Sequence, residues 1–230
     1  MVLRRRLIAA GIVLVVLYAG YMFWFRNLSW FSIDKVTVDG ATTGQRQIQA
    51  AVEQAAGDMT TLHLKDDQLR AAVARFPTVA TVRADTTFPH ELRVTVTERL
   101  PVAVAQIENR QVAVSADGYL LTGLSFDSGE LPRLVGAEAT GPRLDEHSAE
   151  QTAILGATPA PLRDRLQRSS WDEDYGGIVV HLRGAPELRF GDGSRAEDKW
   201  KAAVAVLSSD ERGSPSYLDV SVPDRPVSGG

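Results

Sequence analysis

The sequence predicts an α+β protein with a single N-terminal transmembrane helix, then a βααββ module and a β-rich domain with a late helix and a C-terminal strand. Three observations support this: one long uncharged apolar run, mixed helix and strand patterns in the first half, and short strand patterns between turn signals in the second. The expected parts are a short cytoplasmic N-terminus (1–6), a transmembrane helix (7–25), a first module (31–99), a β domain (100–223) and a flexible tail (224–230).

The composition is typical of a folded protein and excludes several classes of site. The 230 residues are 44% hydrophobic and 23% charged, close to ordinary globular chains. Because the chain has no cysteine, disulfides, thiolate metal sites and thiol nucleophiles are ruled out. Residues 27–230 contain 21 basic and 29 acidic residues, a net charge of −8. An acidic surface repels phosphates, so nucleic acid is not an expected partner.

The apolar run from Leu7 to Phe25 predicts the membrane anchor. Its 19 residues contain no charge and no proline, and a helix of this length spans about 28 Å, close to the hydrocarbon thickness of a bilayer. Arg4, Arg5 and Arg6 precede the run, and basic residues favour the cytoplasmic side. A cleaved signal peptide is the alternative, but bulky aromatics stand where its cleavage site would be. We therefore expect a single-pass plasma-membrane protein whose bulk is extracytoplasmic.

The first exported segment begins with a strand and two helices. Residues 33–39 alternate apolar and polar side chains, which predicts a strand that ends at Gly40. Thr42 and Gln45 fit a capping box that opens the first helix. The apolar positions of the two helices recur at helical spacing; they are Ile48, Val52 and Ala55 in the first helix and Leu69, Val73 and Phe76 in the second, which starts near Asp66.

A hairpin completes this module. Residues 79–86 form its first strand, residues 88–90 its turn and residues 92–98 its second strand, with Leu92, Val94 and Val96 on one face. The order is strand, helix, helix, strand, strand. Two helices on one face of a three-stranded sheet bury a small core.

These residues resemble a known family. The run from Phe31 to Gly40, the Phe88-Pro89 turn with the strand after it, and above all the exit Glu98-Arg99-x-Pro101-Val102-Ala103 are similar to the polypeptide-transport-associated (POTRA) module of the bacterial cell-division family FtsQ/DivIB. The resemblance continues through nearly the whole exported chain. It implies a POTRA fold over residues 31–99 and a β domain after it.

The second module is expected to consist mainly of short strands. Strand patterns occur at 102–107, 111–114, 119–122, 178–182 and 187–190, whereas 123–148 reads as a surface excursion. Helical patterns occur at 148–155, 161–168 and 196–207, the last with Trp200, Val204 and Leu207 on one stripe. Tyr217–Val222 is the expected last strand.

The motifs that could carry chemistry favour structural interpretations. Gly191-Asp-Gly193-Ser-Arg-Ala196 matches a dinucleotide fingerprint, but too little chain follows to build the sheet that such a site needs. The four histidines lack metal-ligand spacing, and no nucleophile elbow occurs. We expect no catalytic residues, no cofactor, no metal and no small-molecule substrate.

The last strand is the candidate partner site. If it lies at a sheet edge, its unpaired backbone groups can accept a partner strand. The resemblance implies that the small membrane-anchored division protein FtsB adds a strand there, and that FtsL and, indirectly, the septal synthase FtsW with its transpeptidase partner are further partners. The implied binding residues are Tyr217, Leu218, Asp219, Val220, Ser221 and Val222.

The expected function is that of a noncatalytic bitopic scaffold that recruits and links divisome proteins for septum assembly. The alternative is a POTRA-type module that receives polypeptides during export or membrane insertion, a role that usually needs repeated POTRA units. An anchored cell-wall enzyme is the third class considered.

Overall fold

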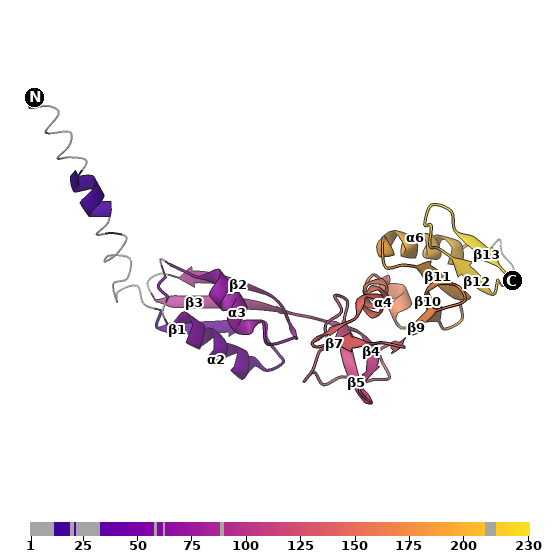
Figure 1. Cartoon of the computed structure of the whole chain (residues 1–230), viewed down its shortest axis with the longest axis horizontal. Helices are drawn as coiled ribbons and strands as arrows, with labels where there is room; N and C mark the ends of the chain where they lie inside the picture. Colours follow the sequence, from indigo (N-terminus) through magenta and orange to yellow (C-terminus); the bar gives the residue numbers. More distant parts are fainter. Residues whose placement is uncertain are drawn as a thin grey trace, which may run out of the picture. The chain divides into compact units, whose positions relative to one another are not determined.

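The computed structural model describes most of the chain (Figure 1): residues 12–18, 21, 33–57, 59–61, 63–87, 90–209 and 215–230. The chain divides into two compact units, of which the first ends at Glu98 and the second begins at Arg99.

The first unit has a three-stranded sheet and two helices in the predicted order. Strand β3 lies in the middle of the sheet, parallel to β1 and antiparallel to β2. The elements are β1 (Lys35–Asp39), α2 (Gln45–Ala56), α3 (Asp66–Val73), β2 (Val79–Thr87) and β3 (Glu91–Glu98). The predicted βααββ arrangement is confirmed.

The core of this unit lies between the apolar face of β3 and the helices. The alternation predicted for β3 is confirmed, because Leu92, Val94 and Val96 are all buried while the residues between them are exposed. Ile48 and Val52 of α2 are fully buried in the same cluster. Each such side chain contributes about 1.5 to 3 kcal/mol by leaving water.

The start of α2 differs from the capping-box prediction. The helix begins at Gln45 and is preceded by Gly44 in the left-handed conformation, without a side-chain cap. The Thr42 hydroxyl instead donates to the Glu98 carboxylate, which also accepts from the backbone N–H groups of Thr42 (2.9 Å) and Thr43 (2.7 Å). The capping box was wrong because a carboxylate 55 residues away in the sequence competes for these donors.

The second unit is built on an eight-stranded sheet of order β13-β12-β11-β10-β9-β6-β4-β5. Its strands are β4 (Pro101–Ile107), β5 (Arg110–Ser115), β6 (Arg133–Val135), β9 (Leu166–Asp172), β10 (Gly177–Leu182), β11 (Glu187–Gly191), β12 (Tyr217–Asp219) and β13 (Val227–Gly229). A small separate hairpin consists of β7 (Ala139–Thr140) and β8 (Arg143–Leu144), and the helices are α4 (Glu146–Gly156), α5 (Ala160–Arg163) and α6 (Ala196–Leu207). The α+β class and the β-rich character of this part are confirmed.

Three expected segments of the second unit differ. The helix expected at 161–168 ends at Arg163, and β9 begins at Leu166. The segment 123–148 contains β6, whose Leu134 is buried in the sheet between β4 and β9, so it is not wholly a surface excursion. The strand expected at 119–122 is reduced to isolated bridges at Tyr119 and Leu120.

The core of the second unit is closed by α6. Trp200 is fully buried, packs on Phe190 with ring centroids 4.8 Å apart, and donates its indole N–H to the Ile154 carbonyl at 2.8 Å. This bond satisfies the one polar atom of a large buried ring. It also ties α6 to α4, beside the end of the sheet that holds β11, β12 and β13.

The predicted anchor Leu7–Phe25 lies largely outside the described residues, as do Arg4, Arg5 and Arg6. Residues 12–18 are helical, and the side chains from Ile12 to Tyr18 are each more than half exposed. No helix among the described residues is long and apolar enough to cross a membrane.

Candidate partner-binding sheet end

Strand β12 contains the first part of the predicted partner-binding segment. It pairs in parallel with β11, Tyr217 lying opposite Glu187, Leu218 opposite Leu188 and Asp219 opposite Arg189. Leu218 and Val220 are fully buried in the core. The Val220 N–H still donates to the Arg189 carbonyl at 2.9 Å, so the pairing with β11 continues one residue beyond the strand.

The strand stops earlier than predicted because side-chain and turn hydrogen bonds redirect the backbone. The Asp219 carboxylate accepts from the Ser221 N–H at 2.8 Å, and the Val222 carbonyl accepts from the Arg225 N–H at 2.9 Å. Such local bonds replace ladder bonds. Ser221 and Val222 therefore belong to a turn, and the prediction of one strand over Tyr217–Val222 was wrong for its second half.

Strand β13 covers the outer side of β12. It runs antiparallel, with Tyr217 opposite Gly229, Leu218 opposite Ser228 and Asp219 opposite Val227. In the described part of the sheet β13, not β12, is therefore the end strand. The condition that β12 lies at an open edge is therefore not met in the described sheet, and the segment 224–230, expected to be a flexible tail, contains a strand. Figure 1 shows the two strands together at the yellow, C-terminal end of the chain.

Tyr217 lies in a stack of aromatic and cationic groups. The Arg189 guanidinium is 4.2 Å from the Tyr217 ring centroid and 5.2 Å from that of Tyr175. The Glu187 carboxylate holds the guanidinium, with Arg189 Nε 3.0 Å from Oε1. Cation–π contacts of this kind contribute about 0.5 to 2 kcal/mol. They fix the Tyr217 ring on β11, away from solvent on one side.

Asp219 and Tyr175 meet at the other end of β12. The Tyr175 hydroxyl lies 3.5 Å from Asp219 Oδ1. Burial raises the pKa of the Tyr175 phenol; the hydrogen bond with Ser221 opposes this change, and the nearby Asp219 charge adds to it. The phenol therefore stays protonated at neutral pH and can act as a hydrogen-bond donor here.

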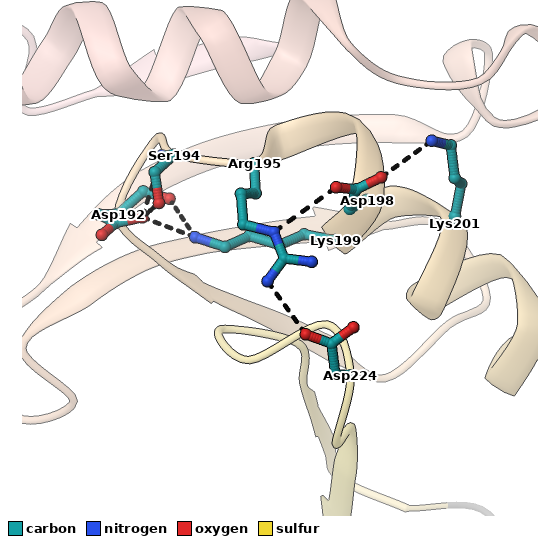
Figure 2. Close-up of polar contacts among 7 residues, drawn as sticks. All are labelled: Asp192, Ser194, Arg195, Asp198, Lys199, Lys201 and Asp224. Carbon is teal, nitrogen blue, oxygen red and sulfur yellow. Dashed lines mark hydrogen bonds and ion pairs between the residues drawn. The ribbon is translucent and has the colours of Figure 1, made fainter.

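A clasp of polar residues, Arg195 with Asp224, connects the β12–β13 loop to the start of α6 (Figure 2). Arg195 Nη1 lies 3.1 Å from Asp224 Oδ2, and Arg195 Nε lies 3.5 Å from Asp198 Oδ2. Asp198 also pairs with Lys201 at 2.9 Å. All four groups are substantially exposed, so solvent screens each pair and its contribution to stability is small.

A second ion pair near the start of α6 joins Lys199 and Asp192, and in this pair the cation is buried. Lys199 is buried, and its ammonium donates to Asp192 Oδ1 at 2.6 Å and to the Asp192 carbonyl at 3.0 Å. Hydrogen bonds from Lys199 and then from Ser194 lower the pKa of Asp192 from 3.8 to about 2. Figure 2 shows Lys199 and Ser194 converging on this carboxylate.

The Gly191–Ala196 motif thus has a structural explanation. Its carboxylate and one of its carbonyls are held by Lys199, and it forms the tight turn from β11 into α6. The sequence pattern located the turn but did not indicate that Lys199 is buried against it.

The histidines make separate local contacts. His147 stacks on Trp171 with ring centroids 4.7 Å apart, and His90 Nδ1 lies 3.7 Å from Asp34 Oδ2. Within the described ranges, no three histidine, aspartate or glutamate side chains come together as a metal site would require.

The sequence did not predict β13 or the clasp. Val227-Ser228-Gly229 is too short for an alternating pattern, and Arg195 and Asp224 are 29 residues apart.

Comparison with known proteins agrees with this architecture. Residues 31–99 match the family described as POTRA domain, FtsQ-type. Over 99% of its length the chain is 26% identical to the protein named Cell division protein FtsQ of Streptomyces venezuelae, covering 84% of that relative. It is 25% identical over 98% of its length to the Streptomyces coelicolor protein of the same name, covering 88% of it.

The family match covers the first unit, and the similarity to the named relatives covers both units. Residues 31–99 are similar to POTRA domains of the FtsQ type, and the similarity to proteins named Cell division protein FtsQ extends over nearly the whole chain.

Proposed function

We propose that this chain is a noncatalytic, single-pass membrane protein of the division septum that recruits and links other divisome proteins. The observation that carries the proposal is the near full-length similarity to proteins named cell division protein FtsQ, together with the FtsQ-type POTRA domain. These similarities support a role in cell division, and the scaffold mechanism is our proposal for that role.

In this proposal residues 7–25 cross the plasma membrane, with Arg4, Arg5 and Arg6 in the cytoplasm. The exposed apolar side chains from Ile12 to Tyr18 support it, because so many exposed aliphatic groups on one helix need a nonaqueous environment. The POTRA domain (31–99) and the β domain, which extends through β13 to the end of the second unit, lie outside. The boundary between the two compact units at Glu98 and Arg99 supports this division.

The β12 end of the second sheet is the proposed docking place for FtsB, with FtsL joining through FtsB and FtsW with its transpeptidase partner held indirectly. Strand addition suits this place because buried side chains anchor β12 in the core. On its outer side β12 pairs with β13, a short strand at the end of the sheet. Anchoring both partners in one membrane raises their effective concentration, so a modest contact suffices.

Depletion in the native bacterium tests the scaffold role. We expect filamentous or branched cells with stalled septa and loss of FtsB from division sites, both restored by the wild-type chain. Normal septa with correctly placed FtsB after depletion would refute a division role.

Two assays on the purified chain separate the scaffold from the other classes. Selective capture of FtsB is expected, whereas equal binding of unrelated extended peptides favours a polypeptide-transport module. Turnover of peptidoglycan by the chain itself would contradict the noncatalytic assignment.

A further inference from the structure

We propose that β13 is a displaceable strand: the chain's own C-terminal segment occupies the place on β12 that a partner strand takes, and docking proceeds by exchange. This inference rests on the proposed function, because it specifies how the partner reaches the β12 end. It converts that end from an open edge into one that is closed until the partner arrives.

The first observation is the contrast in anchoring between the two strands. Strand β12 places Leu218 in the core with no exposed surface, and Val220 just after it is equally buried. Strand β13 contributes no fully buried side chain, and its Val227 is 57% exposed. Because apolar burial is the main stabilising term, opening β13 leaves the core intact.

The second observation is how little else holds β13. The Gly229 carbonyl accepts from the Ser216 N–H at 3.0 Å and from the Ser216 hydroxyl at 3.1 Å. The loop before β13 is held by the exposed Arg195–Asp224 clasp. Short segments with few buried side chains and exposed hydrogen bonds open at low free-energy cost. Strand β13 has these properties, whereas β12 lies between two neighbours.

The third observation concerns what the β12 edge can accept. A β-carbon at Gly229 would lie 2.6 Å from the Tyr217 hydroxyl oxygen and 2.8 Å from ring atom Cζ, so only a residue without a side chain fits opposite Tyr217 as the ring stands. Since Arg189 holds this ring from the other strand, the restriction is part of the site. The incoming segment is therefore an extended, antiparallel strand with glycine opposite Tyr217.

A partner strand can outcompete β13 by length. The turn at Ser221 and Val222 forms only because Asp219 and Arg225 redirect the backbone. When β13 leaves, a longer strand can follow the edge past Asp219 and form ladder bonds that the three-residue β13 cannot. Both competitors are tethered, β13 through its loop and the partner through the membrane. The extra backbone hydrogen bonds of the longer partner strand therefore determine which of the two occupies the β12 edge.

Variants that release or lock β13 test the exchange in opposite directions. Deletion of Val227–Gly230 and the substitution Gly229→Val both remove β13 from β12, the second by collision with the Tyr217 ring. The double variant Asp219→Cys and Val227→Cys places two thiols at directly opposed positions in a chain that otherwise has no cysteine. Val227→Thr is the matched control, because it alters the same exposed strand without a collision or a crosslink.

The probe is the purified extracytoplasmic segment of FtsB from the same bacterium, titrated against the full chain in detergent. We expect release variants to bind about threefold or more tightly than wild type. The oxidised double variant should bind about tenfold more weakly and recover with reductant, once thiol titration shows that the disulfide has formed. Val227→Thr should equal wild type. Loss of binding on deletion, or equal binding by all variants, would overturn the exchange.

Hydrogen exchange separates displacement from simple addition. On FtsB binding, amides of 227–229 should lose protection while those of 217–219 keep or gain it. Increased amide protection at 227–229 would mean that the partner adds outside β13. Concentration-dependent dimers with protected amides at 227–229 would mean that two copies swap this strand. Either result overturns the proposal.

Failure of the proposed partner gives a different pattern. If no variant binds FtsB, the docking assignment under Proposed function is wrong. The displacement of β13 is then tested by hydrogen exchange on the free chain. Amide protection at 227–229 as strong as at 187–191 would overturn it.

Discussion

Lys199 is the residue of the second unit with the most demanding environment. Its ammonium is buried, and both of its hydrogen bonds described above go to Asp192. A buried cation is costly unless a charged or polar partner compensates it. Asp192 therefore stabilises the turn into α6 chiefly by neutralising Lys199.

Asp192→Ala tests this role. Removing the carboxylate leaves a buried ammonium with one carbonyl acceptor, and we expect a loss of about 1 to 3 kcal/mol in the free energy of unfolding of the second unit. Asp224→Ala, which breaks the exposed and solvent-screened clasp to Arg195, should change the free energy of unfolding much less. Urea titration followed by tryptophan fluorescence compares the two. Equal losses would show that burial of Lys199 does not matter.

The pH dependence of stability follows from the same carboxylate. The Lys199 hydrogen bond holds the pKa of Asp192 at about 2 in the folded chain, below its ordinary value of 3.8. The unfolded chain therefore binds the proton more tightly, and the stabilisation by Asp192 is complete above about pH 4 and fades toward about pH 2. The stability difference between wild type and Asp192→Asn should stay constant from about pH 8 to about pH 5 and shrink below about pH 4. A difference that grows on acidification would contradict the assignment.

Single residues show where sequence reasoning stops. The two glycines of 191–196 favour a tight turn, and the structure has one between β11 and α6. Lys199 lies where the resembled family's pattern expects it, but its burial could not be predicted, because lysine is rarely buried and its acceptor belongs to a turn whose geometry depends on the packing of α6.

Among the elements, the end of β3 and the approach to α2 are joined by Glu98. Partial burial raises the pKa of Glu98, but hydrogen bonds from Thr42 and Thr43 outweigh this and leave the pKa below its ordinary value. Gly40 opens the same loop with φ +87°, and a β-carbon there would collide with the Val96 carbonyl oxygen. The carboxylate accepts hydrogen bonds from backbone N–H groups of this loop, as a capping side chain does at the start of a helix.

Glu98→Ala should destabilise the first unit by about 1 to 2 kcal/mol, the range found for loss of a helix cap. Exchange of the α2 amides should accelerate, because the loop that leads into the helix loses its acceptor. The control is Glu91→Ala at the other end of β3, whose ion pair with the exposed Lys35 is worth less than about 1 kcal/mol. Unchanged α2 exchange in Glu98→Ala would refute the capping role.

The elements that sequence patterns predicted are those with regular apolar periodicity. The alternation in β3 and the helical stripe of α2 are examples, and both are buried as expected. The sequence pattern did not predict β9, because Ser169 is its one fully buried side chain and is polar. The Ser169 hydroxyl donates to Gln151 across the core. Strand β6 has a single buried residue and β13 has none, so their places in the sheet depend on partners far away in the sequence.

At the scale of the whole molecule, the Glu98-Arg99 dipeptide marks the point where one unit gives way to the other. Glu98 serves the POTRA domain, whereas Arg99 belongs to the second unit, with its Nε 2.8 Å from Asp117 Oδ2 and its guanidinium 3.7 Å from the Tyr119 ring centroid. Two adjacent charged residues thus stabilise different units. This gives a physical reason for the motif from which the resemblance was first drawn.

The central claim is that the sheet end formed by β12 and its neighbours docks a divisome partner. Photocrosslinking in living cells tests it most directly, with the crosslinker at exposed Val222 beside β12 and, as the control, at exposed Arg110 on the opposite edge strand β5. We expect an FtsB adduct from position 222 and none from position 110. FtsB captured from position 110 and not from position 222 would contradict the account.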